Sequence, residues 1–362
     1  MNPPKYDEPL PVAQAGVGFW GKSWAKLLMS SPYTSLAGIV DPDSERLNRV
    51  ADELELPAER RFSSFRDAVS IGGARAALIA TPPDTHRSLA LEAIDSGLHC
   101  LIEKPLAPSM EEANEIVAYA ERLDRCLMVG QNYRFRRGPE TVRQLIANGA
   151  LGQVEYVHGR LVKETRLDPG GWRDQLAEPI ILDQAVHHLD FVRSVFGLEP
   201  TDVRAHTFNP SWSWFDGNAC ASIELRSKDC YVSYFGSWVS GGSVGVKTSF
   251  DGNWEIQGER GCMRWDFSRI TITPTDLGDL IFYPNAVERE AGLLEIPLVA
   301  LGDEERSGVL KEFAEAIFAG REPRSSGRDN LRTLALVFAA EAASQASGWL
   351  NISDFVSRSV SR

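Results

Sequence analysis

Short apolar runs alternate with longer helical patterns through the first 130 residues of this 362-residue chain. Apolar runs of strand length, bounded by Gly, Pro or Asp, are typical of strands buried on both faces. We expect such strands at Val12–Gly16, Leu36–Val40, Ala76–Thr81, His99–Ile102 and Leu127–Gly130. We expect helices between them at Lys22–Met29, Ser44–Leu54, His86–Ser96 and Ser109–Leu123. Strands that alternate with helices predict right-handed βαβ units and a parallel sheet.

The pattern changes beyond residue 130. Expected elements are a helix over Arg137–Asn148, a half-exposed strand over Val154–Leu161, a loop over Leu167–Pro179 and a helix over Ile180–Phe196. Between residue 202 and about residue 274, runs rich in Trp, Phe, Tyr and Val are separated by turn residues, which is typical of an antiparallel sheet. Two helices follow, near Glu304–Ala319 and Asp329–Ser347. We therefore expect an α/β chain with a doubly wound domain over 1–130 and an α+β domain over 131–362.

Charge and cysteine content exclude several classes of protein. Lys and Arg number 38 against 50 Asp and Glu, and the net charge of -12 has the wrong sign for general binding to nucleic acid. No run of about 18 apolar residues predicts a membrane span, and the first residues do not resemble a signal peptide. Five cysteines without a Cys-x-x-Cys pair argue against a disulfide framework or a zinc module. We expect a cytoplasmic protein.

A glycine-rich turn follows the first expected strand and opens the first helix. It reads Gly16-x-Gly18-x-x-Gly21, with Phe19 and Trp20 between the last two glycines. In such a turn the first Gly permits a sharp bend, the second lets the backbone approach a pyrophosphate, and the third lets helix and strand pack closely. The N–H groups of the helix can then receive the anion. A purely structural turn is the alternative.

An acidic residue stands where this fingerprint expects one. Asp41 lies 20 residues beyond Gly21, at the end of the second expected strand, where a carboxylate can bind the ribose hydroxyls of a dinucleotide. Such a carboxylate repels a 2′-phosphate, so NAD is favoured over NADP, although Ser44 and Arg46 keep NADP possible. Asp41 could also N-cap a helix that has Pro42 at its first position.

Two further segments follow expected strands, at the carboxyl edge where doubly wound sheets bind ligands. One is Glu103-Lys104-Pro105, in which the ammonium group could favour deprotonation of a substrate hydroxyl. The other runs from Thr81 to His86, and its prolines could present backbone groups to a cofactor. An isolated Glu-Lys pair is more often part of a solvated turn, and the segment from Thr81 to His86 does not identify a site by itself either.

A carboxylate and an imidazole are spaced four residues apart in the helix expected over 180–196. Asp183 and His187 should share one helix face, with Asp190 beside them. A carboxylate near an imidazole raises its basicity and prepares it to take a proton near neutral pH. A helix-face ion pair is the commoner use of such a pair, and half of a metal site is a weaker alternative because no third ligand is evident. His188 projects about 100° away and is expected to pack or form a hydrogen bond.

The order of these motifs carries more information than any one of them. Along the chain come Gly16-x-Gly18-x-x-Gly21, Asp41, Ala80-Thr81-Pro82…His86, Glu103-Lys104-Pro105-Leu106, Asn132-Tyr133-Arg134-Phe135, Gly171-Trp172-Arg173, Asp183-x-x-x-His187-x-x-Asp190 and Gly327-Arg328-Asp329-Asn330. This succession closely resembles the glucose–fructose oxidoreductase / inositol dehydrogenase / rhizopine catabolism family of NAD(P)-dependent oxidoreductases. The resemblance spans nearly the whole chain.

The resemblance implies an NAD(P)-binding Rossmann domain and a second domain whose open sheet forms homodimers or homotetramers. It implies that Lys104 is the active-site lysine, that His187 is the acid/base and that Asp183 positions substrate and lysine. Glu103 would line the nicotinamide ribose, and Lys104-Pro105 is often a cis peptide in relatives. The expected cofactor contacts are Gly16, Gly18, Phe19, Trp20, Gly21, Asp41, Thr81, Pro82, His86, Glu103, Lys104 and Gln131. Arg134, Trp172 and Arg173 would lie near the substrate with Lys104, Asp183 and His187.

The implied activity is oxidation of a secondary hydroxyl of a sugar, sugar derivative or cyclitol, with no metal. Glu178-Pro179-Ile180-Ile181 and Ala185 replace glycines that are frequent in relatives, so substrate identity does not transfer. Two alternatives are NAD-dependent glycoside hydrolysis on the same fold and a non-catalytic nucleotide or sugar sensor. The aromatic residues Trp212, Trp214 and Phe215 could frame a sugar pocket, although sheet core or a subunit interface is the commoner use of such residues.

Overall fold

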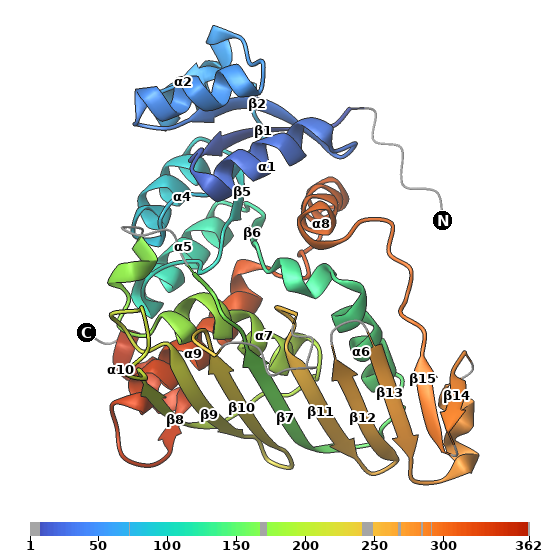
Figure 1. Ribbon diagram of the computed structural model, residues 1–362. Coiled ribbons are helices and arrows are strands. Elements are labelled where there is room, and N and C mark those ends of the chain that lie inside the picture. Colours follow the sequence, from blue (N-terminus) through green and yellow to red (C-terminus); the bar gives the residue numbers. More distant parts are fainter. Residues whose placement is uncertain are drawn as a thin grey trace. The chain divides into compact units, whose positions relative to one another are not determined.

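The chain divides into two units in its computed structural model (Figure 1). The structure describes residues 8–71, 73–166, 172–240, 249–266, 269–283, 285–290 and 292–360. The first unit contains the chain up to Asn132 together with Asp303–Leu331, and the second contains Tyr133–Gly302 and the chain from Arg332 on. Residues 303–331, which we assigned to the second domain, therefore belong to the first unit.

The first unit is built on a parallel sheet of six strands, in the order β3-β2-β1-β4-β5-β6. The strands are β1 (Leu10–Ala15), β2 (Thr34–Val40), β3 (Arg61–Phe62), β4 (Ala76–Ile79), β5 (His99–Ile102) and β6 (Leu127–Val129). The chain reverses its direction of travel across the sheet between β1 and β4, as in dinucleotide-binding domains. The doubly wound parallel sheet expected from the sequence is confirmed.

Helices connect these strands. They are α1 (Phe19–Ser30), α2 (Ser44–Glu53), α3 (Phe65–Ile71), α4 (His86–Asp95), α5 (Met110–Arg122) and, from the later segment, α8 (Glu305–Ala319), with short 3-10 turns at Ala58–Arg60 and Pro83–Thr85. Ser109 caps α5 by accepting a hydrogen bond from the Glu112 N–H, which satisfies a donor that the helix itself leaves unpaired. Gly97 adopts φ +81 just beyond α4, a conformation that favours glycine.

The second unit is built on a sheet of ten strands in the order β14-β15-β13-β12-β11-β7-β10-β9-β8-β16, which Figure 1 shows side by side from β8 to β14. The strands are β7 (Val154–Val162), β8 (Asp202–Phe208), β9 (Cys220–Arg226), β10 (Tyr231–Ser237), β11 (Asn253–Gly258), β12 (Gly261–Asp266), β13 (Arg269–Pro274), β14 (Val287–Glu290), β15 (Leu293–Ile296) and β16 (Leu350–Asn351). Only the β7–β10 pair is parallel among these strands. The expected open, mostly antiparallel sheet is confirmed.

Helical segments of the second unit place its candidate site residues. They are η3 (Asn132–Phe135), α6 (Arg137–Ala147), η4 (Trp172–Gln175), η5 (Ile180–Ala185), α7 (Val186–Ser194), η6 (Leu277–Phe282), α9 (Gly327–Ser344) and α10 (Ile352–Val360). The division between the units falls inside η3 and α9. Phe191 of α7 lies in the core, in ring contact with Trp254 and Trp265. Within the described part of the chain, no helix has the length and apolar content of a membrane span.

Candidate active site

The glycine-rich turn between β1 and α1 has the geometry that the motif predicts. Gly16 has φ +88, and a Cβ atom there would lie 2.5 Å from the Ala80 carbonyl oxygen, while a Cβ atom on Gly21 would lie 2.1 Å from the Gly16 carbonyl oxygen. At Gly18 the same test finds no atom within 4 Å. Gln14 holds the turn closed, since its side-chain amide donates to the carbonyl oxygens of Gly16 (2.8 Å) and Gly21 (2.7 Å). Gln14 was not among the residues expected from the sequence because it belongs to no motif.

The N-terminus of α1 is open for an anion. Gly18 is the N-cap residue, no side chain caps the helix, and its first turn contains no acidic residue. The first N–H groups of such a helix have no partner within the helix, and the helix dipole favours negative charge there. Phe19 is 80% exposed and Trp20 is 47% exposed. The turn therefore offers both the free donors and the open space that a pyrophosphate requires.

Asp41 holds backbone in place at the end of β2. Its carboxylate is buried and accepts hydrogen bonds from the N–H groups of Val17 (3.1 Å) and Asp43 (3.0 Å). The N-cap of α2 is Asp43, whose side chain accepts from the Arg46 N–H, so the alternative that Asp41 caps this helix is wrong. The Arg46 guanidinium lies 3.6 Å from Asp41 Oδ2. A carboxylate has about four acceptor sites, so the two backbone bonds and this ion pair do not use all of them.

The Glu103-Lys104 segment follows β5 directly and is held by its own carboxylate. Glu103 Oε1 accepts a hydrogen bond from Trp24 Nε1 (2.6 Å), and Oε2 accepts one from the Lys104 N–H (3.0 Å). Burial raises the pKa of the Glu103 carboxyl group, whereas the Lys104 charge and the Trp24 hydrogen bond act in the opposite direction. The Lys104-Pro105 peptide is cis, as expected. Trp24, like Gln14, was not expected from the sequence.

The His86 side chain lies between the Thr81 turn and the Lys104-Pro105 turn. The side chain is fully buried; Nδ1 lies 3.0 Å from the Pro105 carbonyl oxygen, and Nε2 lies 2.9 Å from the Thr81 carbonyl oxygen. Burial lowers the pKa of the imidazole. The neutral imidazole that this favours has one N–H, so the ring donates to one of these carbonyl oxygens and lies against the other. The expected contact of His86 with the cofactor stays a prediction.

Gln131 provides an independent test of whether a cofactor fits this unit. The residue follows β6, its side chain is 1% exposed, and neither amide atom has a hydrogen-bond partner among the described residues. Most buried polar side-chain atoms have a hydrogen-bond partner, so a buried amide without one indicates that another molecule binds there. A bound molecule with donor and acceptor groups would satisfy it. The open glycine turn and the orphaned Gln131 amide both fit a dinucleotide.

In the second unit, His187 stacks on Tyr133. The two rings are nearly parallel, with centroids 3.9 Å apart and an interplanar angle of 7°. The Arg136 guanidinium carbon lies 3.5 Å from the centroid of the Tyr133 ring, and this side chain also forms an ion pair with Asp251. At these separations the imidazole and the guanidinium must lie on opposite faces of the tyrosine ring. Burial raises the pKa of Tyr133 to about 12.

The segment that carries Asp183 differs from the expected α-helix. Ile180–Ala185 forms a π-helical turn before α7 begins at Val186, so the premise of one continuous α-helical face from Asp183 to His187 is wrong. Such turns occur frequently at functional sites. Asp183 Oδ2 accepts from Arg173 Nε at 2.9 Å, which joins two of the expected substrate residues. Gly171 lies outside the described residues, as does the side chain of Trp172.

Arg134 and Asp190 are structural residues of the second unit. The Arg134 guanidinium is 5% exposed and donates to both carboxylate oxygens of Asp190, at 2.6 and 2.5 Å. Asp190 accepts a further hydrogen bond from Thr333 Oγ1 (2.9 Å). This buried ion pair joins η3 to α7, and the expected contact of Arg134 with substrate stays a prediction. His188 is also buried and lies 2.7 Å from the Tyr234 hydroxyl and 2.9 Å from the Phe250 carbonyl oxygen, as expected for packing.

Comparison with known proteins decides the family. A model described as "Oxidoreductase family, NAD-binding Rossmann fold" matches residues 10–131, and one described as "GFO/IDH/MocA C-terminal domain" matches residues 140–264. The chain belongs to the GFO/IDH/MocA oxidoreductase family. The first unit thus contains an NAD-binding Rossmann domain. Within the described residues, no group of three or more His, Cys, Asp or Glu side chains could hold a metal ion.

Individual relatives of this GFO/IDH/MocA protein are dehydrogenases. It is 28% identical to the D-apiose dehydrogenase of Paraburkholderia graminis, over 90% of this chain and 85% of that protein. It is 34% identical to the UDP-N-acetylglucosamine 3-dehydrogenase of Acidithiobacillus ferrooxidans, over 52% of this chain and 55% of that protein. An oxidoreductase from Agrobacterium radiobacter, solved with NAD+, L-tartaric acid and magnesium, shares the fold with a TM-score of 0.82 and 23% identity, covering 96% and 99% of the two chains.

Proposed function

We propose that this protein is an NAD-dependent dehydrogenase that oxidises a secondary hydroxyl of a sugar, a sugar derivative or a cyclitol. The family is one of NAD-binding oxidoreductases, and the curated relatives include dehydrogenases of D-apiose, of a nucleotide sugar and of inositol. When bound, NAD accepts the hydride at C4 of its nicotinamide ring. The protein supplies orientation and control of the hydroxyl proton.

We assign His187 as the group that takes the hydroxyl proton, with Asp183 and Arg173 positioning the substrate. The stack on Tyr133 fixes the plane of the imidazole, and a fixed ring suits directional proton transfer. Lys104 donates a hydrogen bond to the reacting oxygen, which favours deprotonation. We assign the dinucleotide to the glycine-rich turn, with the ribose hydroxyls on Asp41 and the nicotinamide end near Glu103 and Gln131.

The position of Lys104 is the observation that best supports this proposal. It follows β5 at the carboxyl edge of the parallel sheet, the edge where ligands bind in doubly wound domains. Its N–H is fixed by the Glu103 carboxylate, which Trp24 holds in turn. A solvated turn has no need of a half-buried carboxylate that accepts from an indole N–H. Glu103 and Trp24 thus fix the backbone at Lys104, as expected for an active-site lysine.

The test is NADH formation at 340 nm across a panel of polyols and aldoses. We expect Lys104→Met and His187→Asn to lower the rate about 100-fold or more, the usual contribution of a group that manages a proton. Lys22→Met is the control, because the Lys22 ammonium lies on the surface of the same unit in an ion pair with Glu53. Wild-type rates in both site variants would refute the assignment. Sugar release without net NADH would instead indicate glycoside hydrolysis.

We also propose that the ten-stranded sheet forms a homodimer or homotetramer in the cytoplasm. Side chains alternate along β8, where Val203 and Ala205 are buried and Arg204, His206 and Phe208 are exposed. The uncovered face carries aromatic side chains, including Phe208 and Tyr156, that suit an interface. Light scattering should give a mass of two or four 40.0 kDa chains, and Tyr156→Glu should lower it. The five cysteines are free thiols, which fits a reducing compartment.

A further inference from the structure

One ammonium group near the His187 stack has no anionic partner. Lys163 follows β7, and its Nζ atom lies 3.3 Å from the centroid of the Phe250 ring. Among the residues that the structure describes, no carboxylate forms an ion pair with Lys163. Burial and the nearby Arg136 charge lower the pKa of this amine. A cation that is partly desolvated and repelled by a second cation would gain from an added anion.

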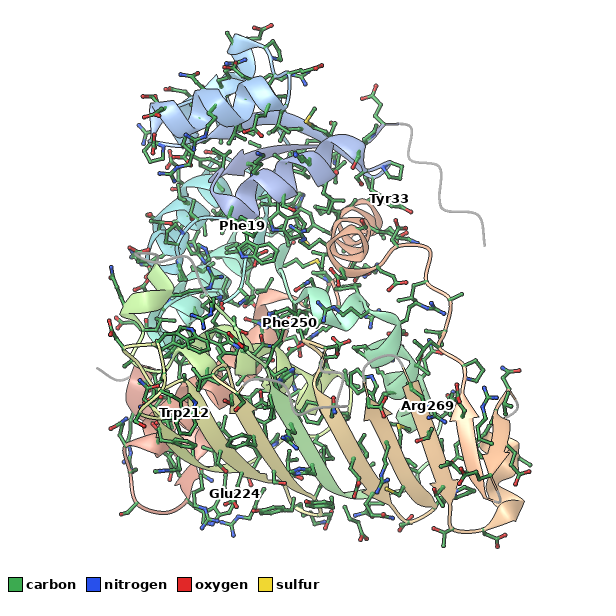
Figure 2. All side chains as sticks on the ribbon, viewed as in Figure 1. Phe19, Tyr33, Trp212, Glu224, Phe250 and Arg269 are labelled. Atoms are coloured by element: carbon green, nitrogen blue, oxygen red, sulfur yellow. The ribbon has the colours of Figure 1, made fainter. Side chains whose placement is uncertain are left out.

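Lys163 belongs to the same side-chain cluster as His187. Phe250 is followed in the chain by Asp251, whose carboxylate pairs with Arg136. The Arg136 guanidinium in turn lies over the Tyr133 ring. Tyr133 in turn stacks on His187. Figure 2 shows Phe250 beyond the ends of the central strands. Trp212, which the sequence offered for a sugar pocket, is 70% exposed and lies near β8, away from Phe250. The unpaired ammonium is therefore connected to the proposed proton acceptor through residues that touch one another.

Among the charged side chains discussed around His187, the cations outnumber the carboxylates by one. Arg136 pairs with Asp251, and Arg173 pairs with Asp183, so each guanidinium is matched by a carboxylate. Lys163 is the unmatched cation among these side chains. The chain as a whole has a net charge of -12, so a local positive excess is not a general property of its surface. One excess charge matches a monovalent anion better than a phosphate dianion.

We propose that the substrate carries a carboxylate and that the Lys163 ammonium binds it. The substrate class is then a sugar acid, such as a uronic or aldonic acid. This inference rests on the proposed dehydrogenase function, because that function makes the His187 cluster the substrate site. Lys163 is assigned to specificity and not to proton transfer. It was absent from the residues expected from the sequence because no motif contains it.

The test compares neutral and acidic members of matched pairs. Aldoses, their uronic and aldonic acids and their 6-phosphates are assayed with NAD for NADH formation. We expect the acids to have the higher kcat/KM. Lys163→Met should lower that value about 10- to 100-fold for the acids, the usual loss for a hydrogen bond to a charged group, and leave neutral sugars unchanged. Lys163→Arg should keep part of the preference, and Lys228→Met, an exposed lysine between β9 and β10, should keep all of it.

Equal rates for neutral and acidic members, a preference for phosphates, or an acid preference that survives in Lys163→Met would each overturn the inference. The proposed function would stand in those cases. If no compound is oxidised, calorimetric titration of the NAD-loaded protein with the same compounds still tests whether Lys163 binds a carboxylate, independently of the dehydrogenase proposal. Selective acid binding that Lys163→Met abolishes would support the inference while the dehydrogenase proposal fails. Titrations without selective acid binding would refute the inference.

Discussion

Alanine at two glycines of the β1–α1 turn should damage different properties of the protein. At Gly21 a new Cβ atom would lie 2.1 Å from the Gly16 carbonyl oxygen, so the helix must move by about 1 Å to reach an ordinary contact. Overpacking of this kind typically costs about 1–3 kcal/mol. For a unit of this size that lowers the unfolding midpoint by about 2–12 °C. Gly21→Ala should therefore destabilise the first unit even without NAD.

Gly18→Ala should have the opposite profile. Gly18 has φ -61 and ψ -166, which alanine adopts without strain, and no atom lies within 4 Å of the new methyl group. The methyl group would occupy the space in front of the open helix end. If a pyrophosphate binds there, it loses one or more hydrogen bonds to helix N–H groups, each worth about 1.5–3 kcal/mol to a charged acceptor. The affinity for NAD should fall about 10- to 100-fold for each lost bond.

Two measurements separate these outcomes. Thermal unfolding without cofactor reports the first unit's stability, and calorimetric titration with NAD reports affinity. Gly302→Ala is the control, since Gly302 is equally open but lies in the second unit. Wild-type affinity for NAD in Gly18→Ala would refute the assignment of the pyrophosphate to this turn. An unchanged melting temperature in Gly21→Ala would refute the packing argument.

Three further changes test the rest of the site. Asp190→Ala leaves the buried Arg134 guanidinium without its carboxylate, and the free energy of unfolding should fall by about 3–5 kcal/mol in denaturant titrations. Trp24→Phe removes a hydrogen bond that lowers the pKa of Glu103, so this pKa should rise, which NMR titration of the Glu103 carboxyl group would measure. Burial lowers the pKa of His188 from 6.5 to about 4, so the unfolded chain binds a proton at a pH where the folded chain does not. Stability should fall by up to about 3 kcal/mol as the pH drops from 6.5 to 4, and His188→Gln should flatten that slope.

Local patterns were sufficient to predict the parallel sheet but not its full membership. The five longer strands are mostly apolar runs, and each was expected within two residues of its observed ends. Strand β3 has two residues and exists because Arg61 and Phe62 pair with the end of β2, which no local pattern indicates. The α8 segment joins the first unit through contacts such as the hydrogen bond from Tyr33 to Asp303. Their separation of 270 residues explains why the domain boundary was misplaced.

The same limit applies to the site. Glycines and acidic residues of the turn could be expected because their spacing is local. Arg306 of α8 lies 5.1 Å from the centroid of the Trp20 ring and 5.4 Å from that of Trp24, and its charge acts on Glu103. Lys163 meets Phe250 across 87 positions of sequence. Such pairs form only when the chain folds, so one sequence without its structure could not have identified them.

An acidic protein that binds an anionic dinucleotide needs attraction that is local. The net charge of -12 repels the ligand at long range, so binding has to come from short-range donors such as the uncapped N–H groups of α1. Those donors are useful only if the turn keeps its shape. The buried polar side chains of Gln14, Asp41 and His86 bond to the backbone of the ligand-facing turns. Polar residues of a binding motif can therefore act by fixing the backbone that contacts the ligand. This explains why Asp41 and His86 belong to recognisable sequence motifs although their side chains are buried.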